Sequence, residues 1–316
     1  MGSRTDILLI SSDRAEDVRT SLPAAMAQPD AHVTVIDNGC RDGTAALARE
    51  AGAEVLTLRS RLTWCAANNA AIAHTAAPEV LLLNADCELA PDFLERTRPR
   101  LTEPNVGSVA PKLVRTLGPG RPLAEIDAAG MVIDRRRKNN LVAHGRFVGD
   151  YDRPGECFGA DGAAALYRRQ MLVDCAVDGQ PFDEDFEKYA SDVDLAWRAQ
   201  LLGWRCAYEP AAIAWHVRSY GPSTRARVPA ADRRAQFRNR YLMIVKNDRP
   251  GALARDLPLL AGYELLALGH VLLRERELLG GYREALERLP RARRARREIQ
   301  RRRRAVAPLG LRPPGE

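Results

Sequence analysis

Short apolar runs recur at regular intervals through the first hundred residues. These runs are residues 7–10, 33–36, 55–58 and 80–83. Their starts lie 22 to 26 residues apart, and alanine-rich stretches with helical spacing, at 44–51 and 66–76, lie between them. Strands that alternate with helices predict parallel β–α–β units and a sheet covered by helices on both faces. Runs that are apolar at nearly every position fit strands that are buried on both sides.

Polar residues follow three of these predicted strands directly. They occupy positions 11–13, 37–39 and 84–86. In sheets of this kind ligands bind beyond the carboxyl ends of the strands. We therefore expect the three segments to meet on one rim of the sheet and to form a ligand site there.

The second half of the chain predicts shorter elements. Residues 131–133 and 141–142 are strand candidates, and the four cations between them, at 135–138, predict a solvated hairpin turn. Ser191 is a favourable N-cap for a helix that runs through Leu202 and stops at Gly203.

Beyond this helix, a polar stretch punctuated by Pro and Gly, residues 217–228, predicts a loop long enough to be functional. Residues 231–246 and the strongly apolar stretch 257–279 predict helices, and the Pro-rich end from Pro308 is expected to be disordered. The predicted parts are a main domain over 1–248, C-terminal helices over 249–306 and a tail over 307–316.

The net charge of +7 is concentrated near the C-terminus. Residues 283–304 contain eleven Arg and three Glu, a local charge of +8, so the remainder of the chain is nearly neutral. These basic residues are separate from the predicted sheet and lack interleaved aromatic side chains, which argues against a nucleic-acid partner. An apolar helix beside a basic stretch suits an anionic membrane surface, and a helical pair packed on the domain is the alternative.

Six cysteines occur without any CxxC pair or histidine at metal-binding spacing. This pattern predicts buried free thiols in a reducing compartment. The N-terminus lacks the apolar core of a signal peptide, and no stretch of eighteen uncharged apolar residues predicts a membrane span. The expected location is the cytoplasm, with peripheral attachment to the inner face of the cell membrane as an option.

Four polar residues are candidates for chemistry. Asp86 follows a predicted strand, and one carboxylate together with substrate phosphates can hold a hard divalent cation. His216 ends another short strand and is either a second ligand on this rim or a packed histidine. Asp192 is placed to take a proton from a hydroxyl. Asp194 points to a different side of the helix and is expected to pair with Arg198 at i+4.

Several loose motifs in a defined order carry a family resemblance. They are residues 35–44, 68–69, 82–86, 159–164, 192–198 with 203–204, and 215–216. Together they resemble the inverting family 2 glycosyltransferases with the GT-A fold, an α/β fold with a mostly parallel, Rossmann-like sheet. The rhamnosyltransferase-like group of bacterial polysaccharide synthesis is the most similar one. The resemblance covers about residues 5 to 248.

The resemblance implies metal-dependent transfer of rhamnose or another hexose from a nucleoside-diphosphate sugar to a hydroxyl of a glycan, glycolipid or other acceptor. Asp192 would be the catalytic base, and Asp86 and His216 would hold Mg²⁺ or Mn²⁺. The nucleotide sugar would contact Ser12, Asp13, Asp37, Asn38, Asn68, Asn84 and Asp86. The transferred sugar and the acceptor would contact Trp64, Asp161, Gly162 and Arg238.

Three segments depart from the usual family pattern and bear on the identity of the donor. Ser12 and Asp13 stand where a Tyr-Asn or similar pair is usual, residues 61–64 replace a frequent Asn-x-Gly-Phe, and Ser191 precedes the base where Glu is frequent.

Two other functions fit parts of the sequence. A sugar-phosphate nucleotidyltransferase shares such a sheet and an acidic metal site, but the residues after the first strand match its Gly-rich, basic signature poorly. A nucleic-acid-binding protein would act through the Arg-rich segment alone. Binding of nucleotide sugars, with and without Mn²⁺, separates the three classes.

Overall fold

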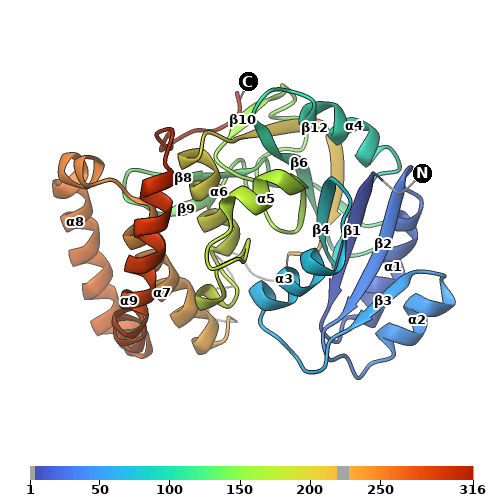
Figure 1. The fold of residues 1–316 in the computed structure, drawn as a ribbon, viewed down its shortest axis with the longest axis horizontal. Coiled ribbons are helices and arrows are strands. Elements are labelled where there is room, and N and C mark those ends of the chain that lie inside the picture. The colour runs from blue at the N-terminus through green and yellow to red at the C-terminus, as the bar shows by residue number, and fades with distance from the viewer. Residues whose placement is uncertain (1–3, 219–227, 316) are drawn as a thin grey trace.

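The computed structural model describes residues 4–218 and 228–315 (Figure 1). The polar loop predicted at 217–228 therefore lies almost wholly outside the described residues. The strands are β1 (Thr5–Ser11), β2 (Ala31–Asp37), β3 (Glu54–Thr57), β4 (Glu79–Asn84), β5 (Cys87–Leu89), β6 (Val106–Thr116), β7 (Pro122–Ala128), β8 (Met131–Ile133), β9 (Asn139–Leu141), β10 (Gly155–Cys157), β11 (Ala164–Arg168) and β12 (Arg205–His216). The helices are α1 (Ala15–Met26), α2 (Thr44–Glu50), α3 (Trp64–His74), α4 (Phe93–Leu101), α5 (Arg169–Cys175), α6 (Ser191–Leu201), α7 (Ala230–Asn247), α8 (Pro250–Arg274) and α9 (Leu279–Arg302), with short 3-10 turns η1 (Glu184–Phe186) and η3 (Arg276–Leu278).

Within the described residues, ten strands form one mixed sheet. Eight of them follow the order β10-β12-β6-β11-β4-β1-β2-β3, while β5 pairs with β12 and β7 pairs with β6. The four predicted apolar runs form β1 to β4, and all three pairings among these strands are parallel. β11 runs antiparallel to β4 and β6. The predicted α/β class, with helices on both faces, is confirmed.

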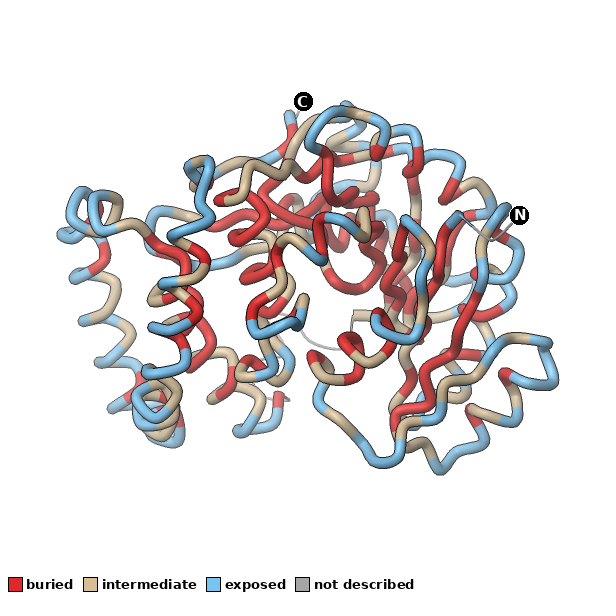
Figure 2. The backbone as a smooth tube through the Cα atoms, in the orientation of Figure 1, coloured by how far each residue is buried: buried red, intermediate tan, exposed pale blue. Residues whose placement is uncertain are grey.

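The strands are apolar throughout because alternate side chains enter two different cores. Ile7 and Leu9 of β1 pack with Val18 of α1 and Phe93 of α4 on one face. Leu8 packs on the opposite face, in the core that also holds residues of α3, α5, α6 and α7. The central strands are accordingly buried in Figure 2 while the outer turns of the helices are not.

Strand register brings the polar segments together on one rim, as predicted. Ser11, the last residue of β1, is opposite Asp37, the last of β2, and Ile10 is opposite Asn84 at the end of β4. The turn that carries Asp86 leads into β5, which pairs with β12 so that Cys87 is opposite His216. The order and direction of the strands therefore place Asp86 and His216 side by side.

Two predictions about local structure are wrong. The hairpin β8–β9 forms, but its turn is not simply solvated, because the Arg137 side chain is fully buried between Asp248 and Asp256. Ser191 does not cap α6 by accepting a backbone N–H. Ala190, in the left-handed conformation at φ 60°, precedes the helix, and the Ser191 hydroxyl donates to the Lys188 carbonyl instead.

The C-terminal helices gather at the end of the molecule opposite β3 (Figure 1). The Arg-rich helix α9 buries Ala292, Ala295 and Ile299 in the main core, so α9 packs on the domain as the helical-pair alternative predicts. The predicted tail, 307–316, is not disordered over its described part, 307–315. Leu309 packs against the core, and the Gly310 N–H donates to the Ile133 carbonyl at 2.8 Å.

Helix α8 differs from its neighbours. By length and composition it is sufficiently long and apolar to cross a membrane, although no uninterrupted apolar stretch predicted a span. Of its 25 residues, those that are buried are Asp256, Leu260 and Val271.

Candidate active site

The ends of β1 and β2 form a polar wall at the rim of the sheet that is held together by Asn38. The Asn38 side-chain amide donates to the Ser12 hydroxyl and to the Leu62 carbonyl, both at 3.0 Å, and its oxygen accepts the Leu62 N–H at 2.7 Å. Asp37 accepts the N–H of Cys40 at 2.8 Å. The strand ends, rather than the helices, therefore fix the loop that leads to Trp64.

Asp13 lies at the outer edge of this wall. It adopts a positive φ of 57° and its carboxylate accepts the Arg41 N–H at 2.6 Å and pairs with Arg61. Ligand atoms of Asp13, Cys40 and Asp42 lie within 4.8 Å of one another. Both carboxylates are already engaged, since Asp42 accepts the Ala15 N–H at 2.7 Å and the Thr44 hydroxyl, also at 2.7 Å.

Asp86 and His216 face each other across the rim. The His216 Nε2 lies 3.5 Å from Asp86 Oδ1, and Arg14 binds the second oxygen of Asp86 at 2.7 Å. Burial alone would raise the pKa of Asp86, but the hydrogen bond with His216 and the Arg14 charge outweigh it and lower that pKa. Asp86 is therefore an anion at neutral pH.

A buried carboxylate that the sequence analysis missed, Asp127, orients His216. Asp127 has no exposed surface, and its Oδ2 accepts a hydrogen bond from His216 Nδ1 at 2.8 Å. Burial opposes charging of the imidazole, but the bonds to Asp127 and Asp86 raise the pKa of His216 to about 9. With Nδ1 committed to Asp127, Nε2 is the ring nitrogen that faces Asp86. Carboxylate–histidine pairs of this kind usually orient metal-binding histidines.

Arg218 extends this array toward the start of β11. Its Nε donates to Asp127 Oδ1 at 2.6 Å and its terminal nitrogen to Asp161 Oδ2 at 2.8 Å. The Asp161 Oδ1 accepts the Ala163 N–H, and the Asn84 N–H donates to the Ala163 carbonyl. A continuous chain of contacts therefore connects Asp86 to the segment that holds Asp161 and Gly162.

Asp192 lies at the other end of that chain of contacts. Its Oδ2 accepts the Gly162 N–H at 3.2 Å, and its Oδ1 accepts the N–H of Val193 at 2.9 Å. Burial, and then the nearby charge of Asp161, raise the pKa of Asp192 to about 6. Asp192 therefore exchanges its proton near neutral pH, which suits a general base.

Trp64 forms a wall beside Asp192. An added Cβ on Gly162 would lie 3.2 Å from the Trp64 ring and 3.6 Å from Asp192 Oδ2, so the three residues surround one small space. Trp64 is fixed there by edge-to-face contact with Phe182, at 5.1 Å between ring centroids. A side chain at position 162 would press against the Trp64 ring and narrow this space.

Asp194, two residues after Asp192, has a structural environment. It is fully buried and binds Arg198 at 3.0 Å, Lys246 at 2.8 Å and the Asn247 amide at 2.8 Å. The predicted pairing of Asp194 with Arg198 is confirmed. The two aspartates of this helix thus have separate surroundings, one at the pocket and one in the core.

Two residues that were predicted to contact the substrates, Asn68 and Arg238, have side chains that are buried and already hydrogen-bonded within the protein. Asn68 is buried in α3, where its amide donates to the Trp64 carbonyl at 2.8 Å. Arg238 is 2% exposed, and its guanidinium binds Asn239, Glu284 and the Phe186 carbonyl. These contacts favour a role in holding the loop before Asp192 over direct contact with sugar or acceptor. The Asn84 side chain is half-buried at the rim.

The cysteines form no disulfide among the described residues. All six are free thiols, and all but Cys40 are buried, as predicted.

Comparison with known proteins gives a family and a fold. The family model described as glycosyl transferase family 2 matches residues 6–175. The uncharacterized protein y4gI of Sinorhizobium fredii is 28% identical over 184 residues, which cover 55% of this chain and 19% of that protein. The chain thus spans about a fifth of the length of this curated relative.

Solved structures with the GT-A fold are similar over most of the chain. The mannosyltransferase PcManGT of Pyrobaculum calidifontis, in complex with GDP-Man and Mn²⁺, has a TM-score of 0.55 at 15% identity and covers 92% of this chain and 88% of its own. TarS of S. aureus, residues 1–349 in complex with UDP-GlcNAc, has a TM-score of 0.55 at 16% identity and covers 92% and 81%. The fold expected from the sequence is confirmed.

Proposed function

The chain belongs to glycosyl transferase family 2, and from this premise we propose that it transfers a sugar from a nucleoside diphosphate to an acceptor hydroxyl with inversion at the anomeric carbon. The observation that supports this most directly is the raised pKa of Asp192, about 6, on a carboxylate that lies beside Gly162 and the Trp64 ring. The contacts from Asp86 through His216, Asp127, Arg218 and Asp161 extend the same pocket to the nucleotide side.

The residues at the rim fit a divalent cation. Asp86 supplies an anionic oxygen, and the His216 Nε2, 3.5 Å from it, would bind the cation after the imidazolium releases its proton there, while Asp127 fixes the histidine through Nδ1. Mg²⁺ or Mn²⁺ bound there would neutralise charge on the departing diphosphate. The solved mannosyltransferase holds Mn²⁺ with GDP-Man, which supports the same cofactor class here.

Side chains and backbone groups of the chain would transfer the proton and position the substrates. The ionised Asp192 carboxylate would take the proton of the acceptor hydroxyl as that oxygen attacks the anomeric carbon. The N–H groups of Gly162 and Val193 hold the carboxylate in place. The Trp64 ring bounds the space in which sugar and acceptor would meet. Asp37, Asn38 and Ser12 form the wall on which the nucleoside would lie.

The donor sugar, the acceptor and the location are finer parts of this proposal. Rhamnose or another hexose is the proposed sugar, and a glycan or lipid-linked alcohol in cell-surface polysaccharide synthesis is the proposed acceptor. Free thiols at all six cysteines favour the cytoplasm. UDP-GlcNAc and GDP-Man, the donors bound by the similar structures, are the first probes to test.

The pH dependence of turnover follows from the protonation of Asp192. Because the base must be ionised, kcat/KM is expected to fall about tenfold per pH unit below about pH 6 and to level off above it. Initial rates of nucleoside-diphosphate release between pH 4.5 and 8 test this. A profile flat through pH 6 would contradict the assignment of Asp192 as the base.

Replacing Asp86 by Asn is expected to remove the effect of Mn²⁺ on donor binding. Ligand loss at a metal site weakens metal binding because an anionic oxygen is lost, and we expect donor affinity in Mn²⁺ to fall roughly 10- to 100-fold, as for other losses at metal sites. Calorimetric titration of the donor with and without Mn²⁺ measures it, with Asp42→Asn as the control at the second acidic group. A nucleotidyltransferase would instead prefer a free nucleoside triphosphate to the nucleotide sugar. If Mn²⁺ changed donor affinity equally in both variants, Asp86 would not be a ligand of the cation.

A further inference from the structure

The polarity of helix α8 is inverted relative to a helix that faces water. The stripe of α8 that faces the domain contains both carboxylates of the helix, the buried Asp256 and the partly exposed Glu264. Its outer side presents leucine side chains that are 38 to 80% exposed, namely Leu257, Leu259, Leu265, Leu266, Leu268, Leu272 and Leu273. Between Arg255 and Arg274 this outer side carries no Asp, Glu, Lys or Arg. Figure 2 shows α8 at the edge of the molecule with little buried surface.

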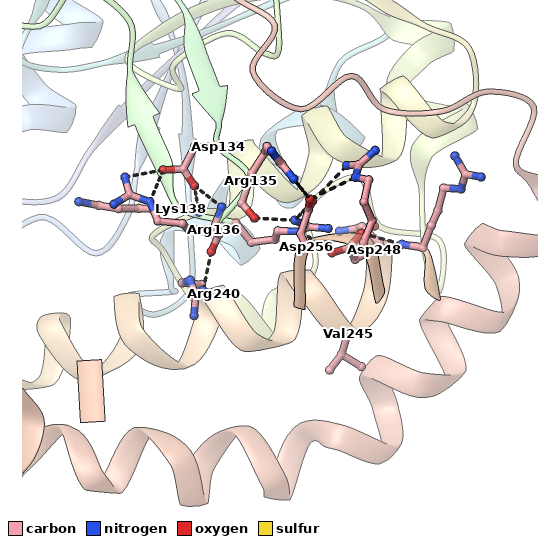
Figure 3. A network of polar contacts seen from close by, with 12 residues as sticks. Asp134, Arg135, Arg136, Lys138, Arg240, Val245, Asp248 and Asp256 are labelled. Atoms are coloured by element: carbon pink, nitrogen blue, oxygen red, sulfur yellow. Dashed lines mark hydrogen bonds and ion pairs between the residues drawn. The ribbon is translucent and has the colours of Figure 1, made fainter. Parts of the chain in front are cut away.

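The side of α8 that faces the domain is fixed there by ion pairs, and Figure 3 shows those of Asp256. Asp256 binds Arg135 at 2.6 Å and also the buried Arg137, which in turn binds Asp248 at 2.6 Å. Glu264 binds Arg240 and the Tyr241 hydroxyl, each at 2.6 Å. Leaving the domain to span a bilayer would separate these charges, at high cost. The helix is therefore held along the domain with its leucines outward.

Arginines flank the leucine surface at both ends. The Arg255 side chain is 62% exposed at the N-terminal end, and Arg274 and Arg276 are exposed at the C-terminal end. Two copies of α8 paired across a twofold axis would bring arginine against arginine, whether the helices ran parallel or antiparallel. A surface of anionic lipid phosphates complements the same arginines while its acyl chains accept the leucines.

We propose that α8 lies flat in the surface of an anionic phospholipid bilayer, with the seven outward leucines in the acyl region and Arg255, Arg274 and Arg276 among the lipid phosphates. A series of contacts connects the segment after α8 with the loop before Asp192. Arg233, at the start of α7, binds Glu277 just after α8. Its neighbour Asp232 accepts a hydrogen bond at 2.8 Å from the hydroxyl of Tyr189, which lies three residues before Asp192.

Flotation of the full chain with vesicles tests this proposal. Vesicles of phosphatidylcholine and phosphatidylglycerol at 7:3 should carry the wild type, and the triple substitution of Leu265, Leu266 and Leu273 by Asp should weaken binding at least tenfold. The matched control replaces Leu117, Phe147 and Val173 by Asp; these side chains are exposed to a similar extent, 56 to 62%, but lie outside α8. The control should float like the wild type.

Two further measurements identify the mode of binding. Arg274→Gln combined with Arg276→Gln should weaken binding to the anionic vesicles several-fold and leave the weak binding to pure phosphatidylcholine unchanged. Alkaline carbonate should release the wild type from the vesicles, whereas resistance to it would indicate a span and overturn the proposal.

A wild type that does not float but is a dimer in light scattering, with the leucine variant a monomer, would assign the surface to a second copy and also overturn the proposal. Donor binding in Mn²⁺ separates this question from the proposed function. The leucine variant should bind the donor like the wild type. If the wild type binds the donor but does not float, the membrane proposal is contradicted and the proposed function is not.

Discussion

Replacing Asp192 by Asn is expected to lower kcat by roughly 10²- to 10⁴-fold, the usual contribution of a positioned general base. The amide has nearly the same shape, and its oxygen can accept the Val193 N–H, but its nitrogen then faces the Gly162 N–H and the longer of the two bonds is lost. It cannot take the acceptor proton at neutral pH. Steady-state release of nucleoside diphosphate in the presence of acceptor measures the change, while donor affinity by calorimetry should stay within a few-fold of the wild type.

The same variant should be more stable than the wild type at pH 7. The pKa of Asp192 rises from 3.8 to about 6 on folding, so folding favours the protonated form. The cost of ionising Asp192 in the folded protein therefore grows as the pH rises from about 4 to 6, and it reaches its full value above about pH 6. The Tm difference between variant and wild type should therefore be positive at pH 7 and close to zero at pH 4. Near-normal turnover of the Asp192→Asn variant would exclude Asp192 as the base. If the variant had a lower Tm than the wild type at pH 7, its loss of rate would be attributed to structural damage.

Replacing Asp194 by Ala, only two residues away, is expected to act on stability. The change leaves Arg198 and Lys246 buried, each 1% exposed at its side chain, without the carboxylate that binds both. Breaking a buried pair by removing one partner typically costs about 3–5 kcal/mol, because a buried charge loses its compensation. Urea denaturation followed by circular dichroism measures the free energy of unfolding.

Asp192→Asn provides the control for this second prediction, since it alters a carboxylate on the same turn of α6 without removing a core partner. Lys246 keeps a second carboxylate, Asp183, so part of its charge stays balanced. If Asp194→Ala cost less than about 1 kcal/mol, the value typical of exposed pairs, the cluster would not support the helix that carries Asp192.

The part of the fold that could be predicted is the part where local pattern and burial agree. Strands β1, β2 and β4 are buried on both sides, so their sequences are apolar at most positions and their ends are marked by polar residues, whereas β3 is a partly exposed edge strand. Because parallel strands share one carboxyl edge, Asp37, Asn38 and Asp86 could be placed on one rim without coordinates. Asp194 was assigned correctly because its partner Arg198 is one helical turn away.

The features that were missed depend on contacts between distant parts of the chain. Arg137 is one of four adjacent cations, a pattern typical of a solvated turn, yet its partners Asp248 and Asp256 lie more than a hundred residues later. Asp127 lies in β7 two residues after Glu125, and only the packing of β7, β6 and β12 brings it to His216. An acid between the apolar residues Ile126 and Ala128 was the available signal. The tail packs through Leu309 and Gly310, which its Pro-rich composition does not indicate.

A crystal structure with Mn²⁺ and a bound nucleotide sugar, recorded at a wavelength where manganese scatters anomalously, tests the shared pocket most directly. We expect the manganese peak between the Asp86 carboxylate and His216 Nε2, and the anomeric carbon of the sugar on the side of Asp192 and Trp64. A peak at Asp13, Cys40 and Asp42, or a sugar whose anomeric carbon faces away from Asp192, would contradict sugar transfer by this set of residues.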